Sequence, residues 1–147
     1  MLYSKLTDEV MRLAYSAHHG QVDKSGVPYI FHPFHLAEQM DTEDEVITAL
    51  LHDVLEDTGV TVEQIRALGI GDKVIEALLL LTHDKSIDYM EYIERLKLNP
   101  LARKVKMADL KHNMDPTRLE CENDSTRRRQ EKYKKAYRIL EDCELSR

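Results

Sequence analysis

The decapeptide ALLHDVLEDT, residues 49–58, combines the composition of a core helix with a group of titratable side chains. Five of its first seven residues are apolar, yet four titratable residues lie among them: His52, Asp53, Glu56 and Asp57. Burying such groups without partners costs several kcal/mol each, which is comparable with the whole stability of a small domain. Either these side chains face water, or something in the interior compensates them.

Capping signals and apolar periodicity place this stretch on one of several helices. Thr42 and Glu45 have the spacing of a capping box, which predicts a helix from about residue 43 to residue 56. Residues 21–31, with Gly26 and Pro28, are predicted to form a loop. Similar signals predict further helices over residues 7–20 (with Thr7 as the cap), 33–40, 61–68, from Asp72 onward (with Asp72 as the cap), 88–96, 100–113 and 125–143. No stretch alternates as a strand would, so we expect a compact all-α protein of about seven or eight helices, a single domain over residues 1–147.

The bulk composition restricts the partners and the compartment. The formal net charge of −6 argues against general nucleic-acid binding, because a phosphate backbone would be repelled. No run approaches the ~18 apolar residues of a membrane span, and residues 1–20 lack the apolar run of a signal peptide. Cys121 and Cys143 match no metal motif or disulfide framework and are expected to be reduced thiols. We therefore expect a cytoplasmic protein without a membrane partner, and its oligomeric state is left open.

The titratable residues of the opening stretch form two adjacent stripes on one side of the predicted helix. His52 and Glu56 are one turn apart, and so are Asp53 and Asp57. A solvated face usually mixes signs, whereas this one has no lysine or arginine, and two aspartates one turn apart repel each other unless a cation intervenes. A bound metal ion would supply that charge. A second His-Asp pair, His83-Asp84, has no acids one turn later and is interpreted as a helix terminus.

Two other segments offer additional metal ligands. In YIFHPFH, His32 directly precedes a proline that can open a helix. In VKMADLKHNMD, an apolar lead-in precedes Asp109, and Asn113 lies one turn further on. Taken alone, His32 could equally be a histidine satisfied by the backbone, and Asp109 an exposed acid.

Together these residues resemble the ligand pattern of a known superfamily. The order of His32, the His52-Asp53 pair and Asp109 is that of the HD superfamily of metal-dependent phosphohydrolases. The segments AHHGQVDKSGVPYIFHP, ALLHDVLEDT and VKMADLKHNM are similar to those of guanosine tetraphosphate (ppGpp) 3′-pyrophosphohydrolases. Such enzymes form the hydrolase half of RelA/SpoT proteins and also occur as small stand-alone proteins. The resemblance covers residues 14–115 and leaves residues 116–147 unmatched.

The resemblance implies an HD-type helical domain that binds one divalent ion and hydrolyses a ppGpp-like nucleotide with metal-activated water. It implies four metal ligands: His32, His52, Asp53 and Asp109. The ion is commonly manganese, and two imidazoles with two carboxylates would also suit iron, cobalt or zinc. The resemblance further assigns catalytic handling of the water to Glu56 and Asp57, and substrate binding to Lys24, Ser25 and Asn113.

Two positions depart from the family pattern. The family usually has an arginine, which packs on the guanine base, where this chain has Asp23, and often has an arginine where this chain has Leu110. Replacing arginine by aspartate removes a planar stacking surface and a positive charge. The substrate could therefore be another phosphorylated nucleotide. A third alternative is a metal-binding regulatory domain without turnover, although retention of Glu56 and Asp57 argues against it.

The basic segment TRRRQEKYKKAYR, residues 126–138, has two interpretations. At helical spacing Tyr133 and Tyr137 share an inner face, and the cations surround the outer one, as expected of a solvated amphipathic helix. Alternatively, one or two of these cations lean over the active site and meet phosphate.

Overall fold

The computed structural model describes residues 1–118 and 122–146, and its regular structure is helical apart from one isolated bridge between Val22 and Pro28. The helices are α1 (Lys5–Ala17), α2 (Phe31–Glu38), α3 (Glu43–Leu51), α4 (Val54–Asp57), α5 (Val62–Arg66), α6 (Asp72–Leu81), α7 (Tyr89–Leu96), α8 (Pro100–Asn113), the short 3₁₀ turn η1 (Pro116–Arg118) and α9 (Asp124–Leu145). This confirms the all-α prediction. The predicted helix over residues 43–56 is present as two helices, α3 and α4. When these two are counted as one, the number of α-helices among the described residues agrees with the expectation.

Several helix starts follow the capping signals in the sequence. The capping boxes at Thr42 and Thr61 are both formed, and Asn99 caps α8 ahead of Pro100. The cap of α1, however, is Ser4 rather than Thr7. Thr7 is buried inside the first turn, where its Oγ1 accepts a hydrogen bond from the Ser4 backbone N–H at 2.7 Å. Ser4 and Thr7 both carry hydroxyl groups and are three residues apart, the spacing of a capping box, so either residue could serve as a cap on sequence grounds.

The first turn of α6 also differs from the expectation. Its N-cap is Gly71, and Asp72 is the first helical residue instead of the cap. An aspartate at this position still favours the helix, because its charge lies at the positive end of the helix dipole.

The helix of the opening stretch breaks between His52 and Asp53. The Nδ1 atom of His52 lies 2.7 Å from the Ala49 carbonyl oxygen, so the imidazole ring is hydrogen-bonded to the backbone close to the end of the helix. Asp53 then adopts φ −109° and ψ 0°, and α4 begins at the next residue. The Asp57 N–H still donates to the Asp53 carbonyl at 2.9 Å, so the two aspartates remain one turn apart.

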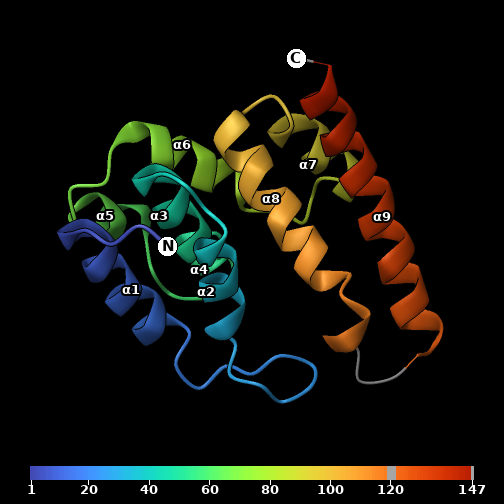
Figure 1. Ribbon diagram of the computed structural model, residues 1–147, viewed down its shortest axis with the longest axis horizontal. Coiled ribbons are helices and arrows are strands. Elements are labelled where there is room, and N and C mark those ends of the chain that lie inside the picture. Colours follow the sequence, from blue (N-terminus) through green and yellow to red (C-terminus); the bar gives the residue numbers. More distant parts are fainter. Residues whose placement is uncertain (119–121, 147) are drawn as a thin grey trace.

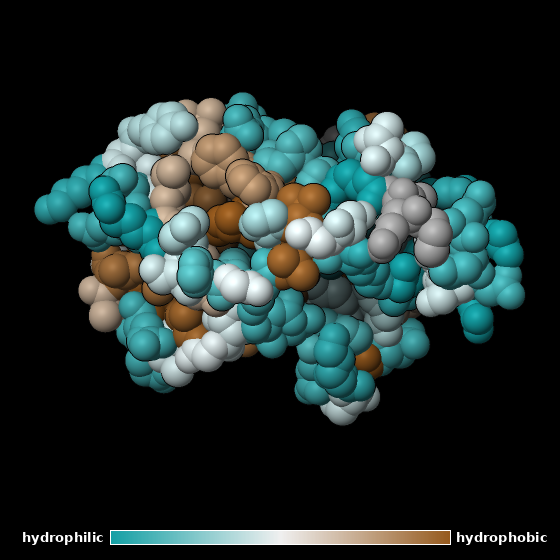
Figure 2. All heavy atoms as spheres, turned by 90° about the horizontal axis from the view of Figure 1, so that it is seen from below, coloured by the Kyte–Doolittle hydropathy of each residue, from teal (hydrophilic) through white to brown (hydrophobic). Residues whose placement is uncertain are grey.

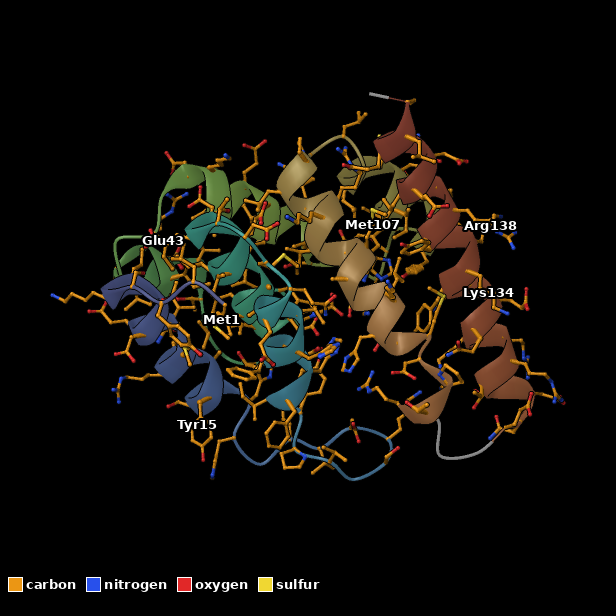
Figure 3. The ribbon with its side chains drawn as sticks, in the orientation of Figure 1. Met1, Tyr15, Glu43, Met107, Lys134 and Arg138 are labelled. Atoms are coloured by element: carbon orange, nitrogen blue, oxygen red, sulfur yellow. The ribbon has the colours of Figure 1, made fainter. Side chains whose placement is uncertain are left out.

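Helix α3 lies at the centre of the protein, where it packs against α1, α2, α6 and α8 (Figure 1). Its residues Val46 to Leu51 are all buried. Helix α9 lies on the outer side of α8 and α7, and its Lys134 and Arg138 point away from the rest of the protein (Figure 3). Leu110, on α8, is fully buried in the core, so the departure from the family pattern at this position is a packing feature.

The loop between α1 and α2 is organised by Asp23. Its Oδ1 atom accepts hydrogen bonds from the Ser25 and Val27 backbone N–H groups at 2.9 and 3.0 Å. Gly26, between them, has φ +82°, a conformation that favours glycine. Asp23 and Ser25 of this loop line two cavities that also contact His32.

The helices and the cysteines can also be compared with the expectations from the sequence. No helix of the described residues is long and apolar enough to cross a bilayer. Cys143 is a free thiol whose Sγ lies 3.5 Å from the Lys97 carbonyl oxygen, whereas Cys121 lies outside the described residues.

Candidate active site

Three elements bring their polar residues together in the interior. His32 comes from α2, His52 from the end of α3, and Asp109 from α8. The His32 Nε2 atom lies 2.8 Å from Asp109 Oδ1, and the His52 Nε2 atom lies 3.6 Å from the same oxygen. All three residues are at most 4% exposed, and one ligand atom from each lies within 4.8 Å of the others. This His/Asp cluster could hold a metal ion.

Asp53 borders this cluster. Its Oδ2 atom lies 3.0 Å from His52 Nε2 and accepts a hydrogen bond from the Tyr29 hydroxyl. The His52 Nε2 atom is fully buried and has no hydrogen-bond partner among the described residues. A buried imidazole nitrogen facing two carboxylates and lacking a hydrogen bond fits a metal ligand, because a divalent cation would use its lone pair and neutralise the acids.

Lys106 and Asn113 complete the surroundings of Asp109. Lys106 Nζ donates to Asp109 Oδ2 at 2.8 Å, and Asn113 Nδ2 donates to Asp109 Oδ1 at 3.0 Å. Burial opposes the charge on Asp109, but Lys106 and His32 outweigh it and hold the pKa of Asp109 well below its usual range. Burial likewise opposes the charge on Lys106, but Asp109 raises its pKa. The cluster is therefore charged even without a metal ion.

The same competition applies to His52 and Asp53. Burial opposes their charges, but the carboxylates of Asp53 and Asp109 raise the pKa of His52. In turn His52 and the Tyr29 hydroxyl lower the pKa of Asp53. Burial and Asp53 raise the pKa of Tyr29, so its hydroxyl keeps its proton.

Glu56 and Asp57, the predicted catalytic acids, have different environments. Glu56 Oε1 accepts the His83 backbone N–H at 2.8 Å, and Lys85 Nζ lies 3.3 Å from Glu56 Oε2. Asp57 is exposed, and burial, Asp53 and Glu56 raise its pKa. The second His-Asp pair, predicted to be a helix terminus, directly follows Thr82, the C-cap of α6. The His83 N–H also holds Glu56, a role that the sequence did not indicate.

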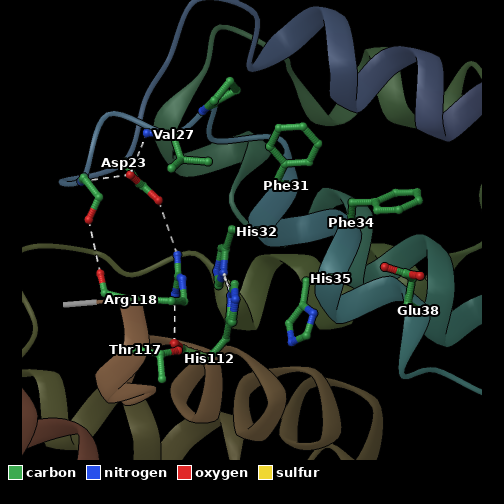
Figure 4. Close-up of a pocket in the computed structure, with 12 residues that line it drawn as sticks. Asp23, Val27, Phe31, His32, Phe34, His35, Glu38, His112, Thr117 and Arg118 are labelled. Atoms are coloured by element: carbon green, nitrogen blue, oxygen red, sulfur yellow. Dashed lines mark hydrogen bonds and ion pairs between the residues drawn. The ribbon is translucent and has the colours of Figure 1, made fainter. Parts of the chain in front are cut away.

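Two cavities adjoin His32, and both are also lined by Asp23, Ser25 and Arg118. The polar one has a volume of about 630 Å³ and is lined by Val22, Asp23, Lys24, Ser25, Tyr29, His32, Asn113, Arg118, Asn123, Thr126, Arg129, Gln130 and Tyr133. The other, about 600 Å³, is lined by Asp23, Ser25, Val27, Pro28, Phe31, His32, Phe34, His35, Glu38, His112, Thr117 and Arg118 (Figure 4). The face seen from below in Figure 2 is largely hydrophilic on the α8–α9 side, and hydrophobic side chains gather on the opposite side.

The three predicted substrate residues all line the polar cavity. Lys24 is exposed on the loop, and burial together with Arg129 and Lys132 lowers its pKa. Ser25 Oγ donates to the Arg118 carbonyl at 3.1 Å. Asn113 contacts Asp109, as described above, so it lies between the cavity and the cluster.

Asp23, which stands where the family usually has arginine, is paired with an arginine from elsewhere in the chain. Arg118 Nη2 lies 3.6 Å from Asp23 Oδ2, and Arg118 Nη1 donates to the His112 carbonyl at 2.8 Å. Arg118 lines both cavities, so a guanidinium is present beside the loop although the loop itself lacks one. The pairing joins positions 95 residues apart, and no local pattern could have indicated it.

Helix α9 contributes one cation to the polar cavity. Arg129 is half-buried and lines this cavity, whereas Arg127, Arg128, Lys134, Lys135 and Arg138 are exposed. Most cations of the basic segment are therefore solvated, as the first interpretation expects, while Arg129 lines the same cavity as His32.

The chain is similar to known proteins both in sequence and in structure. No family model matches the chain. The chain is 32% identical to the guanosine-3′,5′-bis(diphosphate) 3′-pyrophosphohydrolase MESH1 of Danio rerio over 90% of this chain and 81% of that protein. It is 34% identical to the Homo sapiens protein of the same name over 80% of this chain and 72% of that protein.

The chain belongs to the guanosine-3′,5′-bis(diphosphate) 3′-pyrophosphohydrolase family. This confirms the resemblance found in the sequence. A Spiroplasma citri protein of that name is 34% identical over 66% of this chain, which spans only 15% of its length. One solved structure superimposes with a TM-score of 0.74 at 24% identity, covering 95% of this chain and 87% of that one. It is described as a metazoan ortholog of SpoT that hydrolyzes ppGpp, and at this identity it supports the helical fold.

Proposed function

We propose that this protein removes pyrophosphate from the 3′ position of guanosine-3′,5′-bis(diphosphate), with a divalent metal ion as its cofactor. The main support for the proposal is that His32, His52 and Asp109 are buried with their ligand atoms close together, beside the polar cavity. Two relatives that the chain matches over most of their length carry the name of this activity. Hydrolysis of a diphosphate requires an electrophile for the phosphoryl oxygens and a positioned water, and the cluster and the neighbouring acids offer both.

The proposed metal ligands are His32, His52, Asp53 and Asp109. The buried His52 Nε2 without a hydrogen bond and the two adjacent carboxylates fit such an ion. Two imidazole nitrogens and two carboxylates form a mixed donor set that suits manganese, and we propose Mn²⁺ as the ion. When bound, the ion would polarise the phosphoryl group and lower the pKa of a water molecule.

Glu56 and Asp57 are proposed to position the water and move its proton. Glu56 is held by Lys85 Nζ, 3.3 Å from its Oε2 atom, and its carboxylate oxygens can accept a hydrogen bond from water. The raised pKa of Asp57 favours proton exchange with solvent at its exposed carboxyl group. The two acids thus have environments suited to different steps.

The polar cavity is proposed to hold the phosphates. Lys24, Arg118 and Arg129 line it together, in a chain whose net charge is −6. Burial, together with the nearby charges of Arg129 and Lys132, lowers the pKa of Lys24, so this group of positive charges would be stabilised by a polyphosphate. Asn113 lies between these cations and Asp109, close enough to contact a sugar hydroxyl of a bound nucleotide.

The test is hydrolysis of ppGpp by the full chain with Mn²⁺, followed by anion-exchange chromatography of the products. We expect GDP and pyrophosphate in equal amounts, and loss of activity on chelation. Asp53→Ala should lower the rate at least ~100-fold, by analogy with the loss of other single catalytic groups. Asp8→Ala, which removes an exposed aspartate of α1, is the control and should retain full activity. Activity that survives both chelation and Asp53→Ala would contradict the proposal.

A second candidate substrate class follows from Asp23. Because the loop presents a carboxylate tied to Arg118, the base of a different phosphorylated nucleotide could be preferred. The same assay, run on guanosine and adenosine nucleotides that carry a 3′ or 2′ phosphate, distinguishes the two. Turnover restricted to nucleotides other than ppGpp would favour this second candidate and retain the metal centre.

A further inference from the structure

His112 touches the candidate metal centre from outside, and neither the sequence patterns nor the proposed chemistry assigns it a role. Its Nδ1 atom lies 2.7 Å from the Nδ1 atom of His32. The two rings are nearly coplanar, at 4°, with their centroids 5.0 Å apart. Figure 4 shows them side by side at the wall of the second cavity. Two nitrogens at this distance share one proton, so one ring donates and the other accepts.

The geometry of His32 decides which ring must donate when a metal ion is bound. Its Nε2 atom faces the cluster, 2.8 Å from Asp109 Oδ1, and is the atom that would bind the ion. A neutral imidazole that binds through Nε2 carries its proton on Nδ1. His32 must then donate from Nδ1, and the acceptor at this position is His112.

His112 is itself held in place for this task. Arg118 donates to the His112 carbonyl oxygen at 2.8 Å. Because Arg118 also pairs with Asp23, this contact connects the end of α8 to the loop between α1 and α2. The ring of His35 lies against the His112 ring, with centroids 4.1 Å apart. These contacts orient Nδ1 of His112 toward His32 without competing for that nitrogen.

We propose that His112 is a positioning residue, which accepts the Nδ1 proton of His32 and thereby fixes His32 in the tautomer that binds the metal ion. Metal-binding histidines usually donate their second nitrogen to a carboxylate, a carbonyl or water, and here a neutral imidazole takes that place. The inference rests on the proposed metal centre. It requires His112 to be neutral and to carry its own proton on Nε2.

The experiment compares Mn²⁺ affinity among metal-stripped forms of the full chain, by competition with a chelator. His112→Phe keeps a ring against His35 but removes the acceptor, and we expect its dissociation constant to rise about 10–100-fold. His112→Asn restores a polar atom near the position of Nδ1 and should bind within about threefold of the wild type if it accepts the same proton. His19→Phe is the control, because it makes the same substitution at an exposed histidine whose ring lies against Tyr15, and it should leave the affinity unchanged.

Equal affinity in His112→Phe and the wild type would overturn the inference, as would an equal loss in His112→Phe and His112→Asn. A measurement on the unmutated protein is independent of how the variants fold. Long-range ¹H–¹⁵N spectra of the Zn²⁺-loaded chain should show His32 protonated on Nδ1 and His112 on Nε2, and the opposite assignment would refute it. Failure of the wild type to bind metal would instead remove the proposed centre itself.

Discussion

The ion pair between Lys106 and Asp109 gives the most direct test of how the cluster is held together without metal. Lys106 Nζ lies 2.8 Å from Asp109 Oδ2, and the two side chains are only 14% and 6% exposed. Asp109→Asn removes the negative charge and leaves the ammonium buried. Removing one partner of a buried pair costs about 3–5 kcal/mol. Because the Lys106 ammonium also lies 5.4 Å from the Tyr92 ring centroid, we expect the lower end, about 3 kcal/mol.

The double variant isolates the interaction. Lys106→Met removes the other charge, and in the double variant neither buried charge lacks its partner. We therefore expect the two losses to be less than additive by about 2 kcal/mol in the free energy of unfolding. The assay is urea denaturation of the metal-free chain, followed by circular dichroism. The control cycle is Glu91 and Arg95 of α7, an exposed pair 55–56% accessible, whose coupling should stay below about 0.5 kcal/mol.

A Lys106–Asp109 coupling no larger than that of the exposed control pair would show that burial does not strengthen this ion pair. Adding Mn²⁺ provides a second, independent comparison. An ion at 100 times its dissociation constant stabilises a folded protein by about 2.7 kcal/mol if it binds only that state. The wild type should gain this amount, and Asp109→Asn should gain much less. An equal gain in both would show that Asp109 does not hold the ion.

Two further predictions concern parts of the fold away from the cluster. Burial raises the pKa of Glu45, but Lys104 and the capping-box N–H groups outweigh it, so the folded-state pKa lies below the unfolded one. The associated stability is present at neutral pH and lost as the pH falls, so Glu45→Gln should cost about 0.5–1 kcal/mol at pH 7 and almost nothing near pH 3 in urea titrations. Arg103 is 2% exposed and bridges Glu144 of α9 to the Lys97 carbonyl, at 2.6 Å each, so Arg103→Met should cost about 2–4 kcal/mol in the same assay. Glu144→Gln should cost under about 1 kcal/mol, because that side chain is half-exposed, and a larger loss would contradict this account.

The sequence predicted the helices well because their signals are local. Thr42, Thr61 and Asn99 each accept a hydrogen bond from the backbone N–H three residues away, so a short window contains the whole interaction. The break at His52 was missed, although it lies within one such window. Its cause is a side-chain contact with the Ala49 carbonyl, and a histidine in an apolar run carries no signal for that contact.

Residues of the candidate site could be predicted only where they belong to a sequence motif of the family. His32, His52 and Asp109 could be found from the resemblance, and the structure brings them together. Their supporting residues are of common types and lie far away in the sequence. His112 is 80 residues from His32, and nothing in either segment indicates that they touch. The one available signal was for Lys106, three residues before Asp109 on the same predicted helix.

The charges in the opening stretch are compensated before any metal ion binds. His52 and the hydroxyl of Tyr29 contact Asp53, and Lys106 contacts Asp109, so no buried carboxylate of the cluster lacks a donor or a cation. The apolar residues of α3 can therefore be buried at the centre of the protein while its end carries an imidazole and a carboxylate. Because the same contacts orient these groups in the metal-free chain, the ligands need little reorganisation to meet an ion. A preorganised site of this kind should bind metal without a large change in helix content, in contrast to small domains that fold only when metal is bound.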